Sequence, residues 1–132
     1  MENYFQMNFT AQQLGAVSTL GLAHVGDGVY DLLCRAYLCA QGTQTVLKLH
    51  KQTVELVKAT TQAKLVQKIL PKLTDEEMGY FRRGKNAHTH AAPKSASPRE
   101  YAMATGLEAL LGALYLLGRT ERINELFLIM MG

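Results

Sequence analysis

The sequence predicts an all-α protein. Apolar residues recur at helical spacing along the chain, and no run shows the sustained alternation of a half-buried strand. Several positions carry the capping residues that begin helices. With 132 residues, of which 48% are apolar, the chain can bury a core without disulfides or metals. We therefore expect a single helical domain at residues 10–132, preceded by an N-terminal extension at residues 1–9.

The first half of the chain predicts four helices. Thr10 can cap a short one, and the long apolar run that begins at Leu20 predicts a second, which ends near Gly42. A shorter helix at about 44–52 and a longer one at about 54–70 follow. The proline after residue 70 ends the longer helix, because proline cannot continue the hydrogen-bond ladder.

The second half predicts three more helices. Thr74 and Glu77 form a capping box that begins one of them. Ser97 and Glu100 form another, at the start of a long apolar helix. That helix is long enough to raise the question of a membrane span, but an acid near its middle favours a core helix. A last amphipathic helix begins at Thr120.

The apolar run 20–40 contains two acids. In a helix, its polar side chains fall on one stripe, at His24, Asp27, Asp31 and Arg35. We favour a helix, although Asp-Gly between apolar residues is also typical of a hairpin turn. An ionised carboxylate among apolar residues is costly unless it is paired. The stripe is therefore either a narrow solvent-exposed edge or a functional site.

Charge and cysteine content set broad limits on function. The formal net charge of +3 is too small to indicate a nucleic-acid partner by itself. Cys34 and Cys39 lie five residues apart on the predicted helix, on different faces, so they cannot bridge each other. We interpret both as reduced core residues. No signal-peptide pattern begins the sequence, and we expect a cytoplasmic protein.

The segment 81–97 differs from the rest of the chain. It is poor in core-forming residues, and it contains no Asp or Glu. Its basic or imidazole side chains are Arg82, Arg83, Lys85, His88, His90 and Lys94. An unbalanced basic loop attracts phosphates, and the alternative is a surface loop without a ligand. His88 and His90 resemble a metal-binding pair in spacing only, so we treat them as donors to phosphate.

Two acids carry the predicted chemistry. Asp27 and Glu108 each lie on the polar stripe of an otherwise apolar helix, and the two carboxylates meet if these stripes face each other. Carboxylates together in a low dielectric repel unless a cation lies between them. Mg²⁺ uses such oxygen ligands when it acts on phosphate esters. The alternative is a buried ion pair of Glu108 with Arg35 or a lysine.

Two motifs resemble the ribonuclease III family. His-Val-Gly-Asp-Gly-Val-Tyr at 24–30 resembles its signature helix, and Leu-Glu-Ala-Leu-Leu-Gly-Ala-Leu-Tyr-Leu at 107–116 resembles its second acidic helix. Their occurrence together, in this order, makes the resemblance specific. From the short length we expect no double-stranded-RNA-binding domain after the catalytic one, and this expectation narrows the resemblance to the Mini-III ribonucleases. Arg-Gly-Lys-Asn-Ala at 83–87 resembles a loop of that subfamily.

This resemblance implies an all-α ribonuclease III-type domain that forms a two-fold dimer. It implies a Mg²⁺-dependent endoribonuclease, in which Mn²⁺ can substitute, that cleaves double-stranded RNA to 5′-phosphate and 3′-hydroxyl ends. Asp27 and Glu108 would be the catalytic, metal-binding residues. The RNA-binding residues would be Arg83, Lys85, Asn86 and Lys94. The implied substrate is precursor ribosomal RNA of the large subunit.

The sequence also departs from the larger family. Ala23 and Thr105 stand at two positions where that family usually carries further acids, and Mini-III proteins share this reduced set. Asp31 could add a water-mediated ligand or pair with Arg35. His24 could be a ligand, hydrogen-bond the site, or lie in the core or an interface.

Two other functions stay open at the level of sequence. The first is a non-catalytic dimeric module of the same fold that binds double-stranded RNA, which the missing acids leave possible. The second is an all-α interaction protein without a role on RNA, which requires the basic loop to have no ligand. Metal-dependent cleavage separates the enzyme from both.

Overall fold

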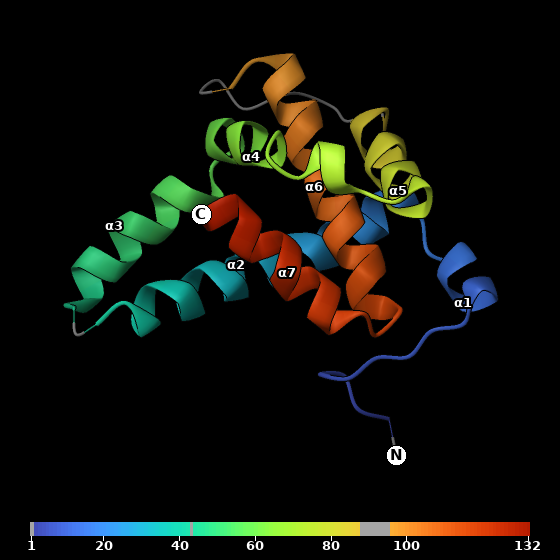
Figure 1. Cartoon of the computed structure of the whole chain (residues 1–132), viewed down its shortest axis with the longest axis horizontal. Coiled ribbons are helices and arrows are strands. Elements are labelled where there is room, and N and C mark those ends of the chain that lie inside the picture. The colour runs from blue at the N-terminus through green and yellow to red at the C-terminus, as the bar shows by residue number, and fades with distance from the viewer. Residues whose placement is uncertain (1, 43, 88–95) are drawn as a thin grey trace.

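The computed structural model describes residues 2–42, 44–87 and 96–132, and throughout these residues the secondary structure is helical. This confirms the predicted all-α class. The order of elements along the chain is shown in Figure 1: α1 (Ala11–Gly15), α2 (Thr19–Ala40), α3 (Val46–Val57), α4 (Ala59–Val66), a 3₁₀ turn (Leu70–Lys72), α5 (Asp75–Lys85), α6 (Pro98–Leu116) and α7 (Thr120–Met131).

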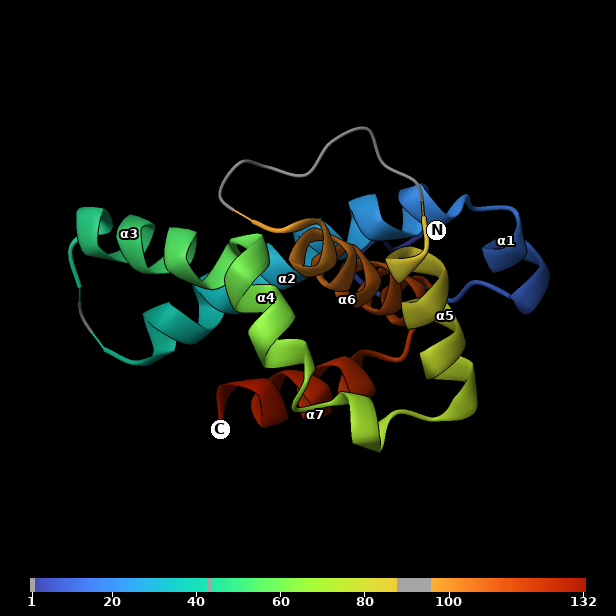
Figure 2. The ribbon, with the colours of Figure 1, turned by 90° about the horizontal axis from the view of Figure 1, so that it is seen from above.

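Helix α6 is the centre of the fold. It packs most extensively against α2 and α5, and also against α4 and α7, so it is enclosed on nearly every side (Figure 2). From Met103 to Leu116, every residue except Glu108 and Tyr115 is buried. A helix that is apolar all round belongs in a protein core. The expected core helix is confirmed, and no described helix is long and apolar enough to cross a membrane.

The helix starts confirm the capping predictions. Thr10, Thr74 and Ser97 each accept a hydrogen bond from the backbone N–H three residues later, and in each case the third residue's side chain accepts from the cap's own N–H. Helix α7 begins at Thr120, as predicted. These starts are set by local hydrogen bonds, which is why the sequence reveals them.

The hairpin alternative for the Gly-Asp-Gly segment is wrong. Helix α2 continues without interruption through residues 26–28. The prediction that both cysteines are core residues is also wrong for one of them. Cys34 is buried, and burial raises the pKa of its thiol to about 11, whereas Cys39 is exposed. Both thiols are free, as expected from their spacing.

The boundary between the two middle helices was also predicted incorrectly. Instead of helices at 44–52 and 54–70, α3 continues through residue 57, the chain becomes extended at Lys58, and α4 ends at Val66. Three side chains donate hydrogen bonds to the last carbonyls of α3. Thr61 Oγ1 donates to Glu55 O at 2.6 Å, Tyr30 OH to Leu56 O at 2.8 Å, and Gln62 Nε2 to Val57 O at 2.8 Å. The break is therefore stabilised by two side chains at the start of α4 and by one tertiary contact from α2.

The N-terminal segment runs beside the turn between α6 and α7. Phe9 N–H donates to Leu116 O at 2.8 Å, and Met7 packs against the core. Gly118, at φ 80°, turns the chain here, and a Cβ atom on it would lie 2.4 Å from Met7 O. The division of the chain at residue 9 stays a prediction.

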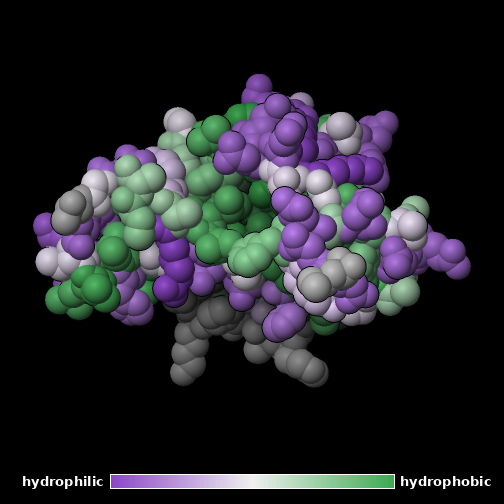
Figure 3. Space-filling view, turned by 90° about the horizontal axis from the view of Figure 1, so that it is seen from below, coloured by the Kyte–Doolittle hydropathy of each residue, from purple (hydrophilic) through white to green (hydrophobic). Residues whose placement is uncertain are grey.

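Several large apolar side chains are exposed. On the face seen in Figure 3, hydrophobic side chains gather around a hollow. The exposed residues of the helices include Leu20 and Leu32 of α2, Val46, Leu47 and Val54 of α3, and Leu128 of α7. Helix α3 projects from the side of the molecule (Figure 2). An apolar surface spread over neighbouring helices is typical of a protein–protein contact.

Candidate active site

The candidate site lies where α2 crosses α6. The two backbones touch there: a Cβ atom on Gly26 would lie 1.6 Å from Glu108 O, and one on Gly112 would lie 1.9 Å from Leu22 O. Only glycine permits so close an approach. Gly26 is therefore a point of close approach between the two helices, whereas Gly28 has no atom within 4 Å of its would-be Cβ.

This crossing brings Asp27 and Glu108 together. Asp27 is exposed, whereas Glu108 is partly buried. Burial, followed by the charge of the neighbouring Asp27 carboxylate, raises the pKa of Glu108 from 4.5 to about 8. The predicted meeting of the two acids is therefore found in the structure. Two neighbouring carboxylates repel each other, which disfavours ionisation of both, and a cation between them would offset this repulsion.

The partner of Glu108 is an amide, not a cation. Gln62, on α4, donates from Nε2 to Glu108 Oε2 at 3.4 Å, and this contact lowers the pKa of Glu108 against the larger raising effects. Among the described residues no lysine or arginine forms an ion pair with Glu108, so the alternative of a buried ion pair is not supported. Sequence reasoning missed Gln62, since nothing in its local pattern marks it.

The polar stripe on α2 is a solvent-exposed edge. Asp31 Oδ2 pairs with Arg35 Nε at 3.0 Å, as the second interpretation of Asp31 predicted, and both side chains are largely accessible. His24 is exposed, which excludes a core position. Of the four residues of this polar stripe, Asp27 is the one that lies beside Glu108.

The two positions without acids are buried on the core side. Ala23 is 7% exposed and Thr105 is 6% exposed. The hydroxyl of Thr105 donates to Tyr101 O at 3.0 Å, one turn back on α6. Within the described part of the chain, no three or more His, Cys, Asp or Glu side chains gather in a group that could hold a metal. The site therefore consists of two acids and one amide.

The basic end of α5 lies beside the same part of α6. A Cβ atom on Gly84 would lie 2.7 Å from Thr105 O, one turn before Glu108, so the last turn of α5 is in close contact with α6. Arg83 lies over the Tyr80 ring at 5.2 Å, and Lys85 and Asn86 are exposed. Lys94, like His88 and His90, lies outside the described residues.

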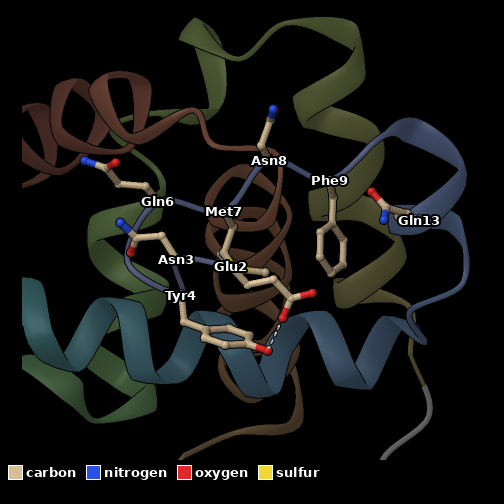
Figure 4. A pocket seen from close by; sticks show the side chains of 8 residues that line it. All are labelled: Glu2, Asn3, Tyr4, Gln6, Met7, Asn8, Phe9 and Gln13. Atoms are coloured by element: carbon tan, nitrogen blue, oxygen red, sulfur yellow. Dashed lines mark hydrogen bonds between the residues drawn. The ribbon is translucent and has the colours of Figure 1, made fainter.

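One pocket of the described residues does not include the acid pair. It has a volume of about 570 Å³ and lies along the N-terminal segment, between Glu2 and Phe9, and beside Gln13 (Figure 4). In its lining, Tyr4 OH donates a hydrogen bond to Glu2 Oε2 at 2.6 Å. The acid pair itself is accessible to solvent on the side of Asp27, which is exposed.

Comparisons with known proteins agree with this geometry. A sequence model of the Ribonuclease III domain matches residues 20–119. A Mini-ribonuclease 3 of Clostridium tetani is 41% identical over 128 residues, which cover 96% of this chain and 85% of the relative. The chain belongs to the ribonuclease III family, among its Mini-ribonuclease 3 proteins. This membership confirms the resemblance inferred from the two motifs.

Two further comparisons support the same family. A Mini-ribonuclease 3 of Symbiobacterium thermophilum is 46% identical over 106 residues, covering 80% of this chain and 82% of the relative. A crystal structure of a protein from Fusobacterium nucleatum has a TM-score of 0.79 at 34% identity, and the match covers 88% of this chain and 93% of that one. The helical architecture described above is thus shared with an experimentally determined structure.

Proposed function

We propose that this protein is a divalent-metal-dependent endoribonuclease that cleaves double-stranded RNA and leaves 5′-phosphate and 3′-hydroxyl ends. The observation that carries the proposal is the meeting of Asp27 and Glu108 at the crossing of α2 and α6. Membership of the ribonuclease III family supports the general activity. The metal, the products and the natural RNA are our proposal.

The residues of the site fit Mg²⁺. Hard oxygen ligands with several positions left for water and phosphate are what Mg²⁺ uses in phosphate chemistry, and Asp27 and Glu108 offer that set. The raised pKa of Glu108 is the expected state of a carboxyl group that faces another carboxylate without a cation. We expect these two residues to hold Mg²⁺, or Mn²⁺ in its place. When bound, the metal would supply charge neutralisation at phosphorus and activation of water.

The protein's own residues would position the RNA. Arg83, Lys85 and Asn86 lie in the last turn of α5 and just after it, beside the part of α6 that carries Glu108. We propose that they, with Lys94, contact phosphates and 2′-hydroxyls across the shallow groove of A-form RNA. Such contacts recognise shape more than sequence. We further propose precursor ribosomal RNA of the large subunit, in the cytoplasm, as the natural substrate.

We also propose that two copies form a two-fold dimer through α2. Its exposed face carries Leu20 and Leu32 near the polar stripe, and Gly28 adds open space at its middle. A self-complementary face of this kind is what a two-fold contact requires. Each copy would then bring its own acid pair to one RNA duplex. Analytical ultracentrifugation that found only monomers at micromolar concentration would contradict the dimer.

A second candidate function is a dimeric module that binds double-stranded RNA without cleaving it. The observation in its favour is that Ala23 and Thr105 occupy positions where the larger family usually carries acids. In this case the pair of Asp27 and Glu108 would be a remnant that binds no catalytic metal. Cleavage assays separate the two functions directly.

The test is cleavage of a long RNA duplex with and without Mg²⁺. The Asp27→Asn and Glu108→Gln variants should lose metal-dependent cleavage and keep RNA binding, because both substitutions preserve shape and remove charge. Glu121→Gln, at an exposed position on α7, is the matched control and should cleave normally. Binding without cleavage by the wild-type protein and all variants would favour the module.

RNA contacts are tested separately. Lys85→Glu should weaken duplex binding and reduce its salt dependence, because a phosphate contact releases counterions when it forms. Lys48→Glu, at an exposed position on α3, is the control for a general change in charge. Equal affinity and an equal salt slope in Lys85→Glu and the wild-type protein would refute the placement of RNA at this end of α5.

A further inference from the structure

Gln62 is the least explained polar side chain of the core. It is 2% exposed, and both hydrogen bonds of its amide nitrogen go to oxygens: Val57 O at 2.8 Å and Glu108 Oε2 at 3.4 Å. Its Oε1 is the one buried side-chain oxygen or nitrogen of the described residues that has no hydrogen-bond partner. A buried polar group without a partner is unusual in folded proteins and calls for an explanation.

The orientation of the amide follows from its partners. Turning it over would place Oε1 against a carbonyl oxygen and a carboxyl oxygen, which offer no donor while Glu108 is ionised. Nε2 therefore faces Val57 and Glu108, and Oε1 is directed elsewhere. The natural partner of such an oxygen is a water molecule enclosed next to the site.

Hydrogen bonds of the neighbouring residues surround Gln62. It lies in the first turn of α4, directly after the break at Lys58. Thr61 Oγ1 bonds Glu55 O from the same turn, and Tyr30 OH bonds Leu56 O from α2. The end of α3, the start of α4 and the middle of α2 are thus bonded together around the amide. A side chain held in this way can fix the orientation of its neighbour.

We propose that Gln62 is the positioning residue of the acid pair: its amide N–H holds Glu108 oriented toward a divalent cation, and its Oε1 accepts a hydrogen bond from a water molecule at the site. This inference rests on the proposed metal-dependent function. An amide suits the task, because it restrains a carboxylate without neutralising it, whereas a lysine or arginine would compete with the cation. Residues that orient metal ligands in this way commonly change metal affinity by about 10- to 100-fold when they are replaced.

The first test measures metal binding on the RNA-free protein. Gln62→Leu and Gln62→Met keep the volume of the side chain and remove its amide. Both should weaken the binding of Mn²⁺, followed by electron paramagnetic resonance, by about 10- to 100-fold. Cleavage should fall at low metal concentration and recover at high concentration, with KM for the duplex unchanged. Gln67→Leu, at the exposed end of the same helix, is the control and should bind Mn²⁺ like the wild-type protein.

The second test needs no substitution at Gln62. Titration of the ¹⁵N-labelled wild-type protein with Mg²⁺ should shift the side-chain amide resonances of Gln62 and leave those of Gln67 in place. Unchanged Gln62 resonances, or folded Gln62 variants that bind Mn²⁺ normally, would overturn the inference. A wild-type protein that does not cleave duplex RNA in Mg²⁺ would instead refute the proposed function, and the resonances would still report on Gln62.

Discussion

Replacing Gly26 by alanine should force α2 and α6 apart. The new Cβ atom would lie 1.6 Å from Glu108 O and 2.5 Å from its carbonyl carbon. Both are backbone atoms, so neither can rotate away as a side chain would. Ordinary contact begins at 3.4 Å, and the two helices must therefore separate by well over an ångström at this point.

The magnitude follows from two opposing effects. Alanine in a helix interior is favoured over glycine by about 1 kcal/mol. Overpacking costs about 1–3 kcal/mol, and more where the backbone must move. We expect a net loss of about 2 kcal/mol in the free energy of unfolding. Cleavage should fall by about 100-fold or more, because displacing α2 also displaces Asp27 from Glu108.

Urea unfolding of Gly26→Ala and of Gly79→Ala gives the comparison. Gly79 lies inside α5, and nothing lies within 4 Å of its would-be Cβ, so this variant should gain about 1 kcal/mol from helix propensity alone. The two substitutions are chemically identical and should have opposite signs. A Gly26→Ala variant as stable as Gly79→Ala, with full activity, would refute the close contact between the helices.

Three further predictions concern charge and the surface of α2. Arg122 donates to both carboxylate oxygens of buried Glu77, so Arg122→Ala should lower the free energy of unfolding in urea by about 3 kcal/mol. Arg119→Ala removes an exposed ion pair and should lower it by at most about 1 kcal/mol, and equal losses in the two variants would contradict this difference. In metal-free protein the raised pKa of Glu108 means that the folded state binds the proton of this carboxyl group more tightly than the unfolded state does. The protonated carboxyl group therefore contributes fully to the free energy of unfolding below pH 4.5, and this contribution is lost as the pH rises toward about 8. Glu108→Gln should lack that component of the pH dependence in thermal unfolding with chelator present, and identical profiles would show that the carboxyl group is not perturbed. Gly28→Ala should weaken self-association in ultracentrifugation if α2 packs closely against its copy, whereas an unchanged dimer would place the contact elsewhere.

Sequence alone predicted the features that depend on local hydrogen bonds and on spacing. The predicted capping boxes at Thr74 and Ser97 are formed by residues three apart, so the pattern contains the whole interaction. Thr10 was predicted as a cap, and the structure adds the reciprocal bond with Gln13. The meeting of Asp27 and Glu108 was also predictable, because each lies on the polar stripe of an otherwise apolar helix, and the two carboxylates meet when these stripes face each other.

The features that were missed depend on contacts between distant parts of the chain. The break at Lys58 has neither glycine nor proline to mark it, and its carbonyls are bonded by side chains that include Tyr30, on another helix. The same holds for Gln62, which contacts Glu108 across 46 positions of sequence. The buried pair of Glu77 and Arg122 was missed for the same reason, because each residue alone resembles an ordinary charge on a helix surface.

The break between α3 and α4 also has an electrostatic consequence. The carboxyl end of a helix carries a partial negative charge of about half an electron, concentrated on its last carbonyls. Val57 O belongs to that end, and a single amide nitrogen joins it to the carboxyl group of Glu108. The helix dipole of α3 therefore adds to the negative potential at the acid pair. Unlike a third carboxylate, this contribution requires no proton to be released, so it is present at every pH at which the protein is folded.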